Sequence, residues 1–245
     1  MKVLFLTRYP YEGASSRYRV YQYLPHLKEL GIEAKTQSFM SPHFYKVNFT
    51  QGQFTEKTLL TLVAFMKRLW ALLFFWRYDV IYMQREILPF GPIFIERILK
   101  VFGATLIFDY DDALFIYQKS THNKLMNFLR APNRIYKIFS TSDCVMAGNN
   151  YLRDVAADYC KNSYCFEVAE DTVRIQMRPP QSNNNGVRIG WLGSTSTVKY
   201  LELIQEPLKH VCEKYDNITI ENIGCLLYTS PSPRDQRGSR MPSSA

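Results

Sequence analysis

An acidic run, Phe108-Asp-Tyr-Asp-Asp-Ala-Leu-Phe115, contains the residues best suited to chemistry. Residues 105–108 are predicted to form a buried strand, so Asp111 and Asp112 come after its carboxyl end, where α/β proteins build their sites. Carboxylates in that place could act as acid, base or nucleophile, or hold a divalent cation that bridges a diphosphate. They could also do no more than cap the next loop, and the residues alone leave these alternatives open.

A second candidate site, for phosphate, lies within the first thirty residues. The apolar run from Val3 to Leu6 predicts a buried parallel strand, and the loop Gly13-Ala-Ser-Ser16 separates it from a predicted helix. Backbone N–H groups and the positive end of a helix dipole meet at such a loop, which favours phosphate. We therefore expect Gly13, Ser16 and Arg17 to bind a phosphorylated donor, and Arg19 to line the cleft on another face. An ordinary strand–helix unit with solvated arginines is the alternative.

The same order of features recurs near residue 190. Residues 187–192 predict a strand, and a small polar loop that begins with Gly193, Ser194 and Thr195 follows it. The proline- and asparagine-rich stretch 178–186 has nothing to bury and predicts a linker. We expect one domain at 1–177 and the start of another at 187–224, with a ligand between them and both loops near its phosphates.

These residues need a sheet to position them. Short apolar runs alternate with helical patterns along the chain, which predicts an α/β fold with a doubly wound, Rossmann-like parallel sheet. Pro25 is expected to kink the first helix. The predicted strands of the first domain are 3–6, 34–39, 80–83, 105–108, 144–147 and 164–168, and the main predicted helices after the first are 58–77, 93–102, 124–129 and 150–159.

Four blocks of the chain resemble glycosyltransferases of the GT-B type, family 4 (glycosyl transferases group 1). They are Gly13–Val20, Tyr78–Glu86, Phe108–Phe115 and Ile189–Leu201, and they follow the family's order across residues 1–224. The resemblance implies two Rossmann-like domains, a nucleoside diphosphate sugar as donor and retention at the anomeric carbon. It also implies a saccharide or lipid-linked acceptor held by the N-terminal domain, in the synthesis of cell-surface polysaccharide or lipopolysaccharide.

The same resemblance implies roles for individual residues. Asp111 and Asp112 are expected to be catalytic, beside the transferred sugar, and Arg85 and Glu86 to line the acceptor side of the cleft. Asp171 falls where the family has a Pro-x-x-Asp-Thr segment, although this chain lacks the proline. The family implies no metal at the acidic run, so we expect no cofactor besides the donor sugar nucleotide.

Two other functions remain as alternatives. The acidic run also resembles the opening motif of haloacid-dehalogenase-type phosphatases, with Asp109 as nucleophile and Asp111 as acid and base. That motif normally lies on the first strand of its domain, and Ala113 stands where the motif usually has Thr or Val. The other alternative is a module that binds a sugar nucleotide or a partner without catalysis.

The last 21 residues, 225–245, break the pattern. They are rich in Ser, Pro and Arg and show no apolar period after Leu227, so we expect them to be disordered. They also resemble translated sequencing-adaptor sequence, which we exclude from the fold. The second domain is therefore expected to be incomplete, and this chain is expected to be inactive on its own.

Composition narrows the possible partners and compartment. The chain of 245 residues has a net charge of +8, which suits an anionic donor or membrane face. We expect no nucleic-acid partner, because no basic stripe with interleaved aromatics occurs. Five cysteines without CxxC spacing and four scattered histidines predict reduced thiols and no metal cluster. The apolar run after Lys2 is short and broken by Arg8, so no signal peptide is expected and the protein is predicted to be cytoplasmic.

The stretch from Thr58 to Trp76 is strongly apolar but has Lys67 and Arg68 in its middle. A membrane-spanning helix would have to bury both charges, so we do not expect a span. A helix packed on the sheet is one interpretation. A helix lying on the inner face of the membrane, as a peripheral contact, is the other, since the stretch has tryptophans beside its basic pair.

Overall fold

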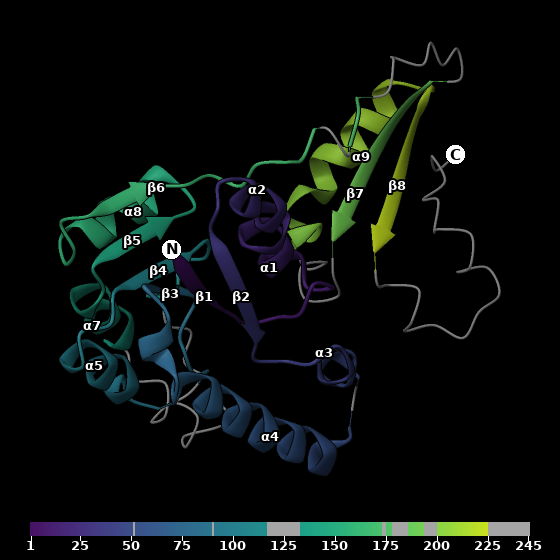
Figure 1. Ribbon diagram of the computed structural model, residues 1–245. Helices are drawn as coiled ribbons and strands as arrows, with labels where there is room; N and C mark the ends of the chain where they lie inside the picture. Colours follow the sequence, from purple (N-terminus) through teal and green to yellow (C-terminus); the bar gives the residue numbers. More distant parts are fainter. Residues whose placement is uncertain are drawn as a thin grey trace. The chain divides into compact units, whose positions relative to one another are not determined.

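The computed structural model describes residues 1–50, 52–89, 91–116, 133–172, 175–177, 186–193 and 200–224 (Figure 1). The chain divides into two compact units, Met1–Gln176 and Met177–Ala245. Three predicted features lie outside the described residues: the helix at 124–129, most of the linker at 178–186 and the tail at 225–245.

The first unit is built on one parallel sheet of six strands in the order β2-β1-β3-β4-β5-β6. This confirms the predicted α/β fold with a doubly wound, Rossmann-like sheet. The strand order reverses between β1 and β3, and their carboxyl ends mark the switch point where ligands of such sheets bind. The strands are β1 (Lys2–Thr7), β2 (Glu33–Ser38), β3 (Val80–Gln84), β4 (Leu106–Tyr110), β5 (Cys144–Ala147) and β6 (Ser163–Cys165).

Helices cover both faces of the sheet. The step from β1 to β2 runs in one direction across the sheet and the steps from β3 to β6 in the other, so right-handed crossovers place their helices on opposite faces (Figure 1). The helices of the first unit are α1 (Ala14–Arg19), α2 (Leu24–Glu29), α3 (Pro42–Phe49), α4 (Phe54–Leu72), α5 (Phe94–Val101), α7 (Arg134–Thr141) and α8 (Asn150–Ala157), with 3₁₀ turns η1 (Tyr21–Tyr23) and η2 (Phe75–Arg77).

The core divides in the same way because successive strand residues point to opposite faces. Leu4 and Leu6 of β1 join a large buried cluster with residues of α4, α5, α7 and α8. Val3 and Phe5 join a small cluster with Val20 and with side chains of α2. The face with the small cluster also contains a hollow of about 360 Å³ with a mostly apolar lining to which Arg19 contributes.

The first predicted helix is divided into two. Helix α1 ends at Arg19, a 3₁₀ turn follows, and α2 begins at Leu24 with Pro25 in its first turn. Proline has no N–H to donate, so it fits the first turn of a new helix better than the interior of a continuous one. The break that Pro25 was expected to cause is therefore larger than a kink.

Strand β4 differs from its prediction in a way that affects the candidate site. It was expected at 105–108 but runs from Leu106 to Tyr110, and Asp109 pairs in the ladder with Gln84 on one side and Met146 on the other. Asp109 therefore lies within the strand, and only Asp111 and Asp112 follow its end.

The apolar stretch at 58–77 also folds differently from its prediction. It forms α4, which begins four residues earlier, at Phe54, and ends at Leu72 before the short turn η2. None of the helices in the described part of the chain has the length and apolarity that a bilayer span requires.

The second unit contains a two-stranded parallel ladder. Strand β7 (Val187–Gly193) pairs with β8 (Ile218–Gly224), beginning with Val187 opposite Ile218. The 3₁₀ turn η4 (Glu202–Ile204) and helix α9 (Gln205–Lys214) form part of the connection between the two strands. This order is that of one β–α–β unit.

Gly13 provides a test of the loop that precedes α1. It is the N-cap of α1, and a Cβ atom added there would lie 2.3 Å from the Cβ of Tyr9. We expect Gly13→Ala to lower the free energy of unfolding by about 1–3 kcal/mol, as overpacked sites do. Urea unfolding followed by circular dichroism measures the loss.

Gly190→Ala is the control for this substitution, because a Cβ atom at Gly190 meets nothing within 4 Å. Equal stability of the two variants would show that the loop adapts to the added methyl group.

Candidate functional site

Polar side chains of three segments meet at the carboxyl ends of β1, β3 and β4. Gln84, the last residue of β3, donates from Nε2 to the Ser15 hydroxyl at 2.9 Å and accepts from the Ser16 hydroxyl at 2.6 Å. The Ser15 hydroxyl in turn donates to Oδ2 of Asp111 at 2.8 Å. Asp111 is thereby joined to the first turn of α1 at the switch point of the sheet.

Ser16 was predicted to bind phosphate, and its hydroxyl is already used within the protein. The side chain is buried, and its oxygen accepts from the Tyr9 N–H at 3.1 Å while it donates to Gln84. Ser16 therefore connects α1 to β3. Since the Ser15 hydroxyl is bound to a carboxylate, the hydroxyls of both serines contact protein groups.

Arg17 lies beside this network with its guanidinium near two tyrosine rings. Its Cζ is 5.9 Å from the ring centroid of Tyr11 and 5.3 Å from that of Tyr18. The side chain is half-buried, and no carboxylate in the described part of the chain forms an ion pair with it. Arg17 is thus a cation of α1 that can still meet an anion.

Arg19 is buried, although it contributes to the lining of the mostly apolar hollow on its face of the sheet. Both its side chain and that of Asp109 are fully buried, and the guanidinium binds both oxygens of the carboxylate. Nη1 also donates to the carbonyl of Phe166, which follows β6. Arg19 faces inward because α1 packs on the sheet there, and its charge is neutralised by Asp109.

The same pair weakens the case for a phosphatase. A nucleophilic carboxylate has to reach the substrate's phosphorus atom, and Asp109 has no exposed surface. Burial raises the pKa of Asp109 to about 6, although the hydrogen bonds and charge of Arg19 oppose this rise. Asp109 is therefore a buried structural carboxylate.

Asp111 and Asp112 follow β4 and are at least partly accessible. Asp112 accepts from Nη2 of Arg85 at 3.0 Å, and its side chain is exposed. Arg85 has a left-handed backbone, with φ of 65°, and its N–H donates to the carbonyl of Asp109 at 2.8 Å. Such backbone strain in a non-glycine residue is found preferentially at functional sites.

Gly148 allows the chain after β5 to approach the acidic run. A Cβ atom at Gly148 would lie 3.0 Å from the Cα of Asp111, and the Gly148 N–H donates to the carbonyl of Tyr110. The close approach of two backbones therefore leaves no room for a side chain at Gly148 beside Asp111.

A buried arginine that the sequence analysis did not assign to the sheet lies at the end of β1. Arg68 of α4 is 1% exposed, donates from Nη2 to the carbonyl of Thr7 at 2.6 Å and lies over the ring of Phe39. Burial, together with the charge of Arg8, lowers its pKa to about 9. The spacing of Ala64, Arg68 and Leu72 by four residues was the signal that could have placed it on the inner face of the helix.

The structure describes some of the remaining predicted site residues. Glu86 follows Arg85 and is half-buried, and the carbonyl of Asp171 accepts from the Ile175 N–H at 2.8 Å. Gly193 is the last residue of β7, whereas Ser194 and Thr195 lie outside the described residues. Within the described ranges, no three His, Cys, Asp or Glu side chains come together as a metal site would require.

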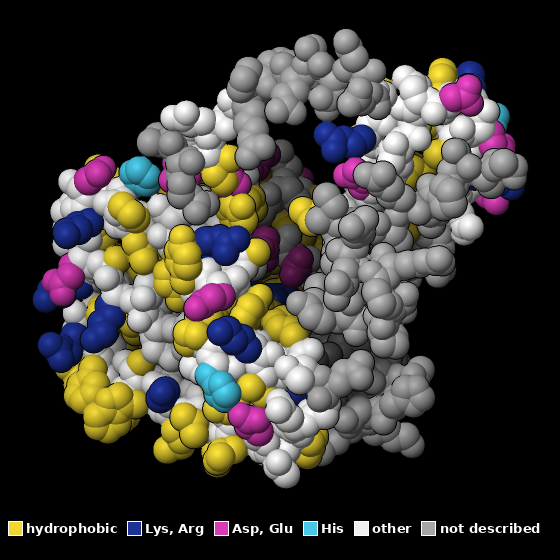
Figure 2. Space-filling view, turned by 90° about the vertical axis from the view of Figure 1, so that its right-hand side faces the viewer, with side chains coloured by type: hydrophobic (Ala, Val, Ile, Leu, Met, Phe, Trp, Pro, Cys, Tyr) yellow, Lys and Arg dark blue, Asp and Glu magenta, His cyan; other side chains and the backbone are white. Residues whose placement is uncertain are grey.

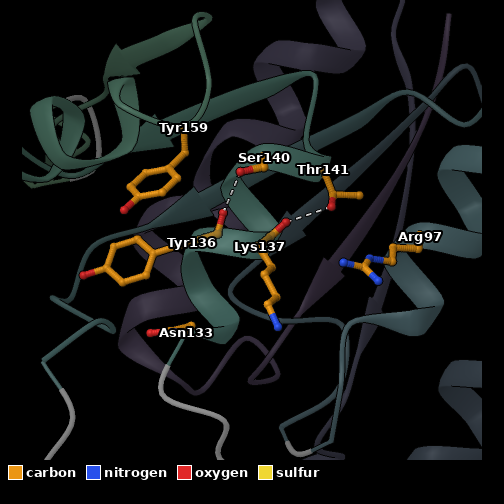
Figure 3. A pocket seen from close by; sticks show the side chains of 7 residues that line it. All are labelled: Arg97, Asn133, Tyr136, Lys137, Ser140, Thr141 and Tyr159. Carbon is orange, nitrogen blue, oxygen red and sulfur yellow. Dashed lines mark hydrogen bonds between the residues drawn. The ribbon is translucent and has the colours of Figure 1, made fainter.

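A separate hollow of about 370 Å³ lies beside α7 and contains none of these residues (Figure 3). Its hydroxyls are used within the helix, because Ser140 donates to the carbonyl of Tyr136 and Thr141 to that of Lys137. Tyr136 stacks on Tyr159 with ring centroids 4.8 Å apart. The polar groups of this hollow are satisfied or solvated, so the carboxyl edge of the sheet remains the better candidate for a functional site.

Comparison with known proteins gives a likeness of fold. No family model matches the chain, and no curated protein matches it. Two of the solved structures that match are described as an alpha-glucosyltransferase in complex with UDP and a 13-mer DNA containing a HMU base. They are 11% identical to this chain, with TM-scores of 0.46 and 0.48.

The matches cover 86% and 91% of this chain but only 55% and 56% of the solved chains. The chain thus spans about half the length of the structures that it matches. At this identity the likeness concerns the fold alone, and membership of family 4 is a finer statement than it supports.

One expectation from the sequence has to be corrected. We excluded a nucleic-acid partner because the chain has no basic stripe with interleaved aromatic residues. The two solved structures named above are glucosyltransferases that contain DNA together with UDP. The missing stripe is therefore no ground for excluding nucleic acid, and the exclusion is withdrawn.

The buried pair gives a stability prediction. Asp109→Ala leaves the guanidinium of Arg19 buried without its partner, so we expect a loss of about 3–5 kcal/mol in the free energy of unfolding. The double variant Arg19→Met with Asp109→Leu removes both charges and should recover most of that loss. Urea unfolding measures both, and a loss below about 1 kcal/mol in the single variant would indicate an exposed, weak pair instead.

The raised pKa of Asp109 gives a prediction for pH. The folded protein holds this proton up to a pKa of about 6, whereas an unperturbed aspartate loses it near 3.8. The stability contributed by this group is therefore fully present below about pH 4 and is lost as the pH rises through 6. Unfolding is measured across this window for the wild type and Asp109→Asn, and the difference isolates this carboxyl group. A difference that increases with pH would show that Arg19 holds the pKa below its ordinary value.

Proposed function

We propose that the first unit is the acceptor-side part of a glycosyltransferase, and that the complete protein moves a sugar from a nucleoside diphosphate sugar to an acceptor hydroxyl. The observation that carries this proposal is the position of Asp111. Its carboxylate lies at the switch point of the sheet, binds the Ser15 hydroxyl at 2.8 Å and is not neutralised by a buried cation.

The groups around Asp111 suit a ligand with many hydroxyls. A carboxylate that already accepts a hydrogen bond from one hydroxyl has lone pairs for another, and Gln84 and Arg85 supply N–H donors close by. A diphosphate beside Asp111 would meet a like charge. This favours sugar hydroxyls at Asp111 and leaves Arg17 as the residue of the first loop that faces a phosphate, while Gly13 and Ser16 shape the loop.

Asp111 and Asp112 would act on the transferred sugar. Sugar transfer passes through a state with positive charge on the sugar ring and negative charge growing on the diphosphate. A carboxylate near the ring stabilises the positive charge, and cations and N–H groups stabilise the negative charge of the diphosphate. The candidates for binding the diphosphate are Arg17 and the loop that begins with Gly193, Ser194 and Thr195. The proposal requires no metal.

The more specific parts of this proposal rest on the four sequence blocks that resemble GT-B glycosyltransferases. They favour family 4, retention at the anomeric carbon, and a saccharide or lipid-linked acceptor in cell-surface polysaccharide or lipopolysaccharide synthesis. Arg85, Glu86 and Asp171 are the proposed acceptor-side or cleft residues. A DNA acceptor has to be tested as well, because the solved proteins of similar fold contain DNA.

Asp111→Asn tests this function in the full-length protein. Transfer of labelled sugar from a panel of nucleoside diphosphate sugars is measured with saccharide, lipid-linked and DNA acceptors, with EDTA present. We expect kcat to fall by roughly 100-fold, since a positioned carboxylate typically contributes that much. The thermal midpoint should change little, because the side chain is not in the core.

Asp154→Asn is the matched control, since Asp154 is an exposed aspartate of the first unit that pairs only with its neighbour Arg153. Unchanged kcat in Asp111→Asn with a lowered thermal midpoint would mean that Asp111 only caps the loop. Sugar binding by a wild type that transfers to none of these acceptors would favour the non-catalytic module.

A further inference from the structure

Helix α4 has apolar side chains on two opposite faces. Its inner face buries Ala64, Arg68 and Leu72 against the first unit. Its outer face carries a second stripe at spacings of three and four residues, so that its members lie on one line along the helix. These members are 55–65% exposed: Leu59, Leu62, Met66, Trp70 and Leu73.

Aromatic side chains extend this stripe beyond the end of the helix. The rings of Trp70 and Phe74 lie 5.7 Å apart, as do those of Phe74 and Trp76, and Phe75 contacts Phe102 at 6.3 Å. Phe102 is 70% exposed. We call the stripe together with Phe74, Trp76 and Phe102 the outer patch. Figure 2 shows hydrophobic side chains along the lower edge of the molecule, the level at which α4 lies in Figure 1, with basic, acidic and His side chains among them.

Every charge along this segment is positive. Residues 57–77 contain no Asp or Glu, and their charged residues are Lys57, Lys67, Arg68 and Arg77. Arg68 is buried, whereas Lys67 and Arg77 are exposed and form no ion pair with a described residue. The outer patch is thus an apolar surface with unpaired cations beside it.

We propose that the outer patch of α4 lies on an anionic lipid surface. Tryptophan and phenylalanine favour the boundary between headgroups and acyl chains, and exposed Lys and Arg are attracted to anionic headgroups. A second copy of the chain fits less well, since a twofold contact through this patch would bring the exposed cations Lys67 and Arg77 of both copies into one interface. This inference is independent of the proposed sugar transfer.

The tryptophans provide a direct measurement of contact with lipid. Two of the three tryptophans, Trp70 and Trp76, belong to the outer patch, and Trp191→Phe removes the third. We expect the emission of this variant to shift to the blue with vesicles that contain phosphatidylglycerol, and brominated acyl chains to quench it. Neutral phosphatidylcholine vesicles should bind less, and added salt should weaken binding to the anionic ones. No shift and no co-sedimentation with anionic vesicles would overturn the proposal.

Substitutions separate the apolar and the electrostatic contributions. Lys67→Glu with Arg77→Glu should weaken partitioning at least about tenfold, because each basic residue near an anionic surface adds to binding. Met66→Gln with Trp70→Gln should weaken it comparably. Lys161→Glu and Tyr164→Gln are the controls, since both side chains are exposed elsewhere on the first unit and should leave vesicle binding unchanged.

Two outcomes would contradict a lipid surface. Patch variants that are folded by circular dichroism and partition like the wild type would exclude α4 as the contact. A concentration-dependent dimer that Met66→Gln with Trp70→Gln abolishes, in a protein that ignores vesicles, would assign the outer patch to a second copy.

Discussion

A buried ion pair connects the parts of the first unit that carry the candidate site. Arg19 of α1 and Asp109 of β4 have no exposed side-chain surface, and the same guanidinium reaches the carbonyl after β6. Two desolvated charges are costly unless they satisfy each other, so the position of α1 on the sheet is determined by this contact. Because Ser15 and Ser16 belong to α1, the pair also determines where their hydroxyls meet Gln84 and Asp111.

Two carboxylates that are close in the sequence therefore have different environments in the structure. Asp109 points into the sheet and is neutralised, whereas Asp111, two residues later, follows the strand end and binds a hydroxyl. A strand that ended before Asp109 would have exposed it. The longer β4 is what makes one carboxylate structural and leaves the other available to a ligand.

The sheet could be predicted from sequence because its signal is local. Apolar runs of four residues, such as Val3 to Leu6 and Cys144 to Ala147, indicate buried strands wherever they occur. The partners of Arg19 and Arg68 could not be predicted in this way. Asp109 is 90 residues from Arg19, and Thr7 is 61 residues from Arg68, so only the folded topology brings each pair together. The candidate residues were accordingly found by type, while their division into buried and accessible groups needed the structure.

Arg68 has a consequence for the stability of two elements that are far apart in the sequence. Its guanidinium bridges the C-terminal part of α4 and the last carbonyl of β1, and burial makes that bridge expensive to break. Moving α4 away from the end of β1 would leave a buried guanidinium without this hydrogen bond. A substitution that displaces the helix therefore also removes a hydrogen bond from the strand end that precedes the candidate site.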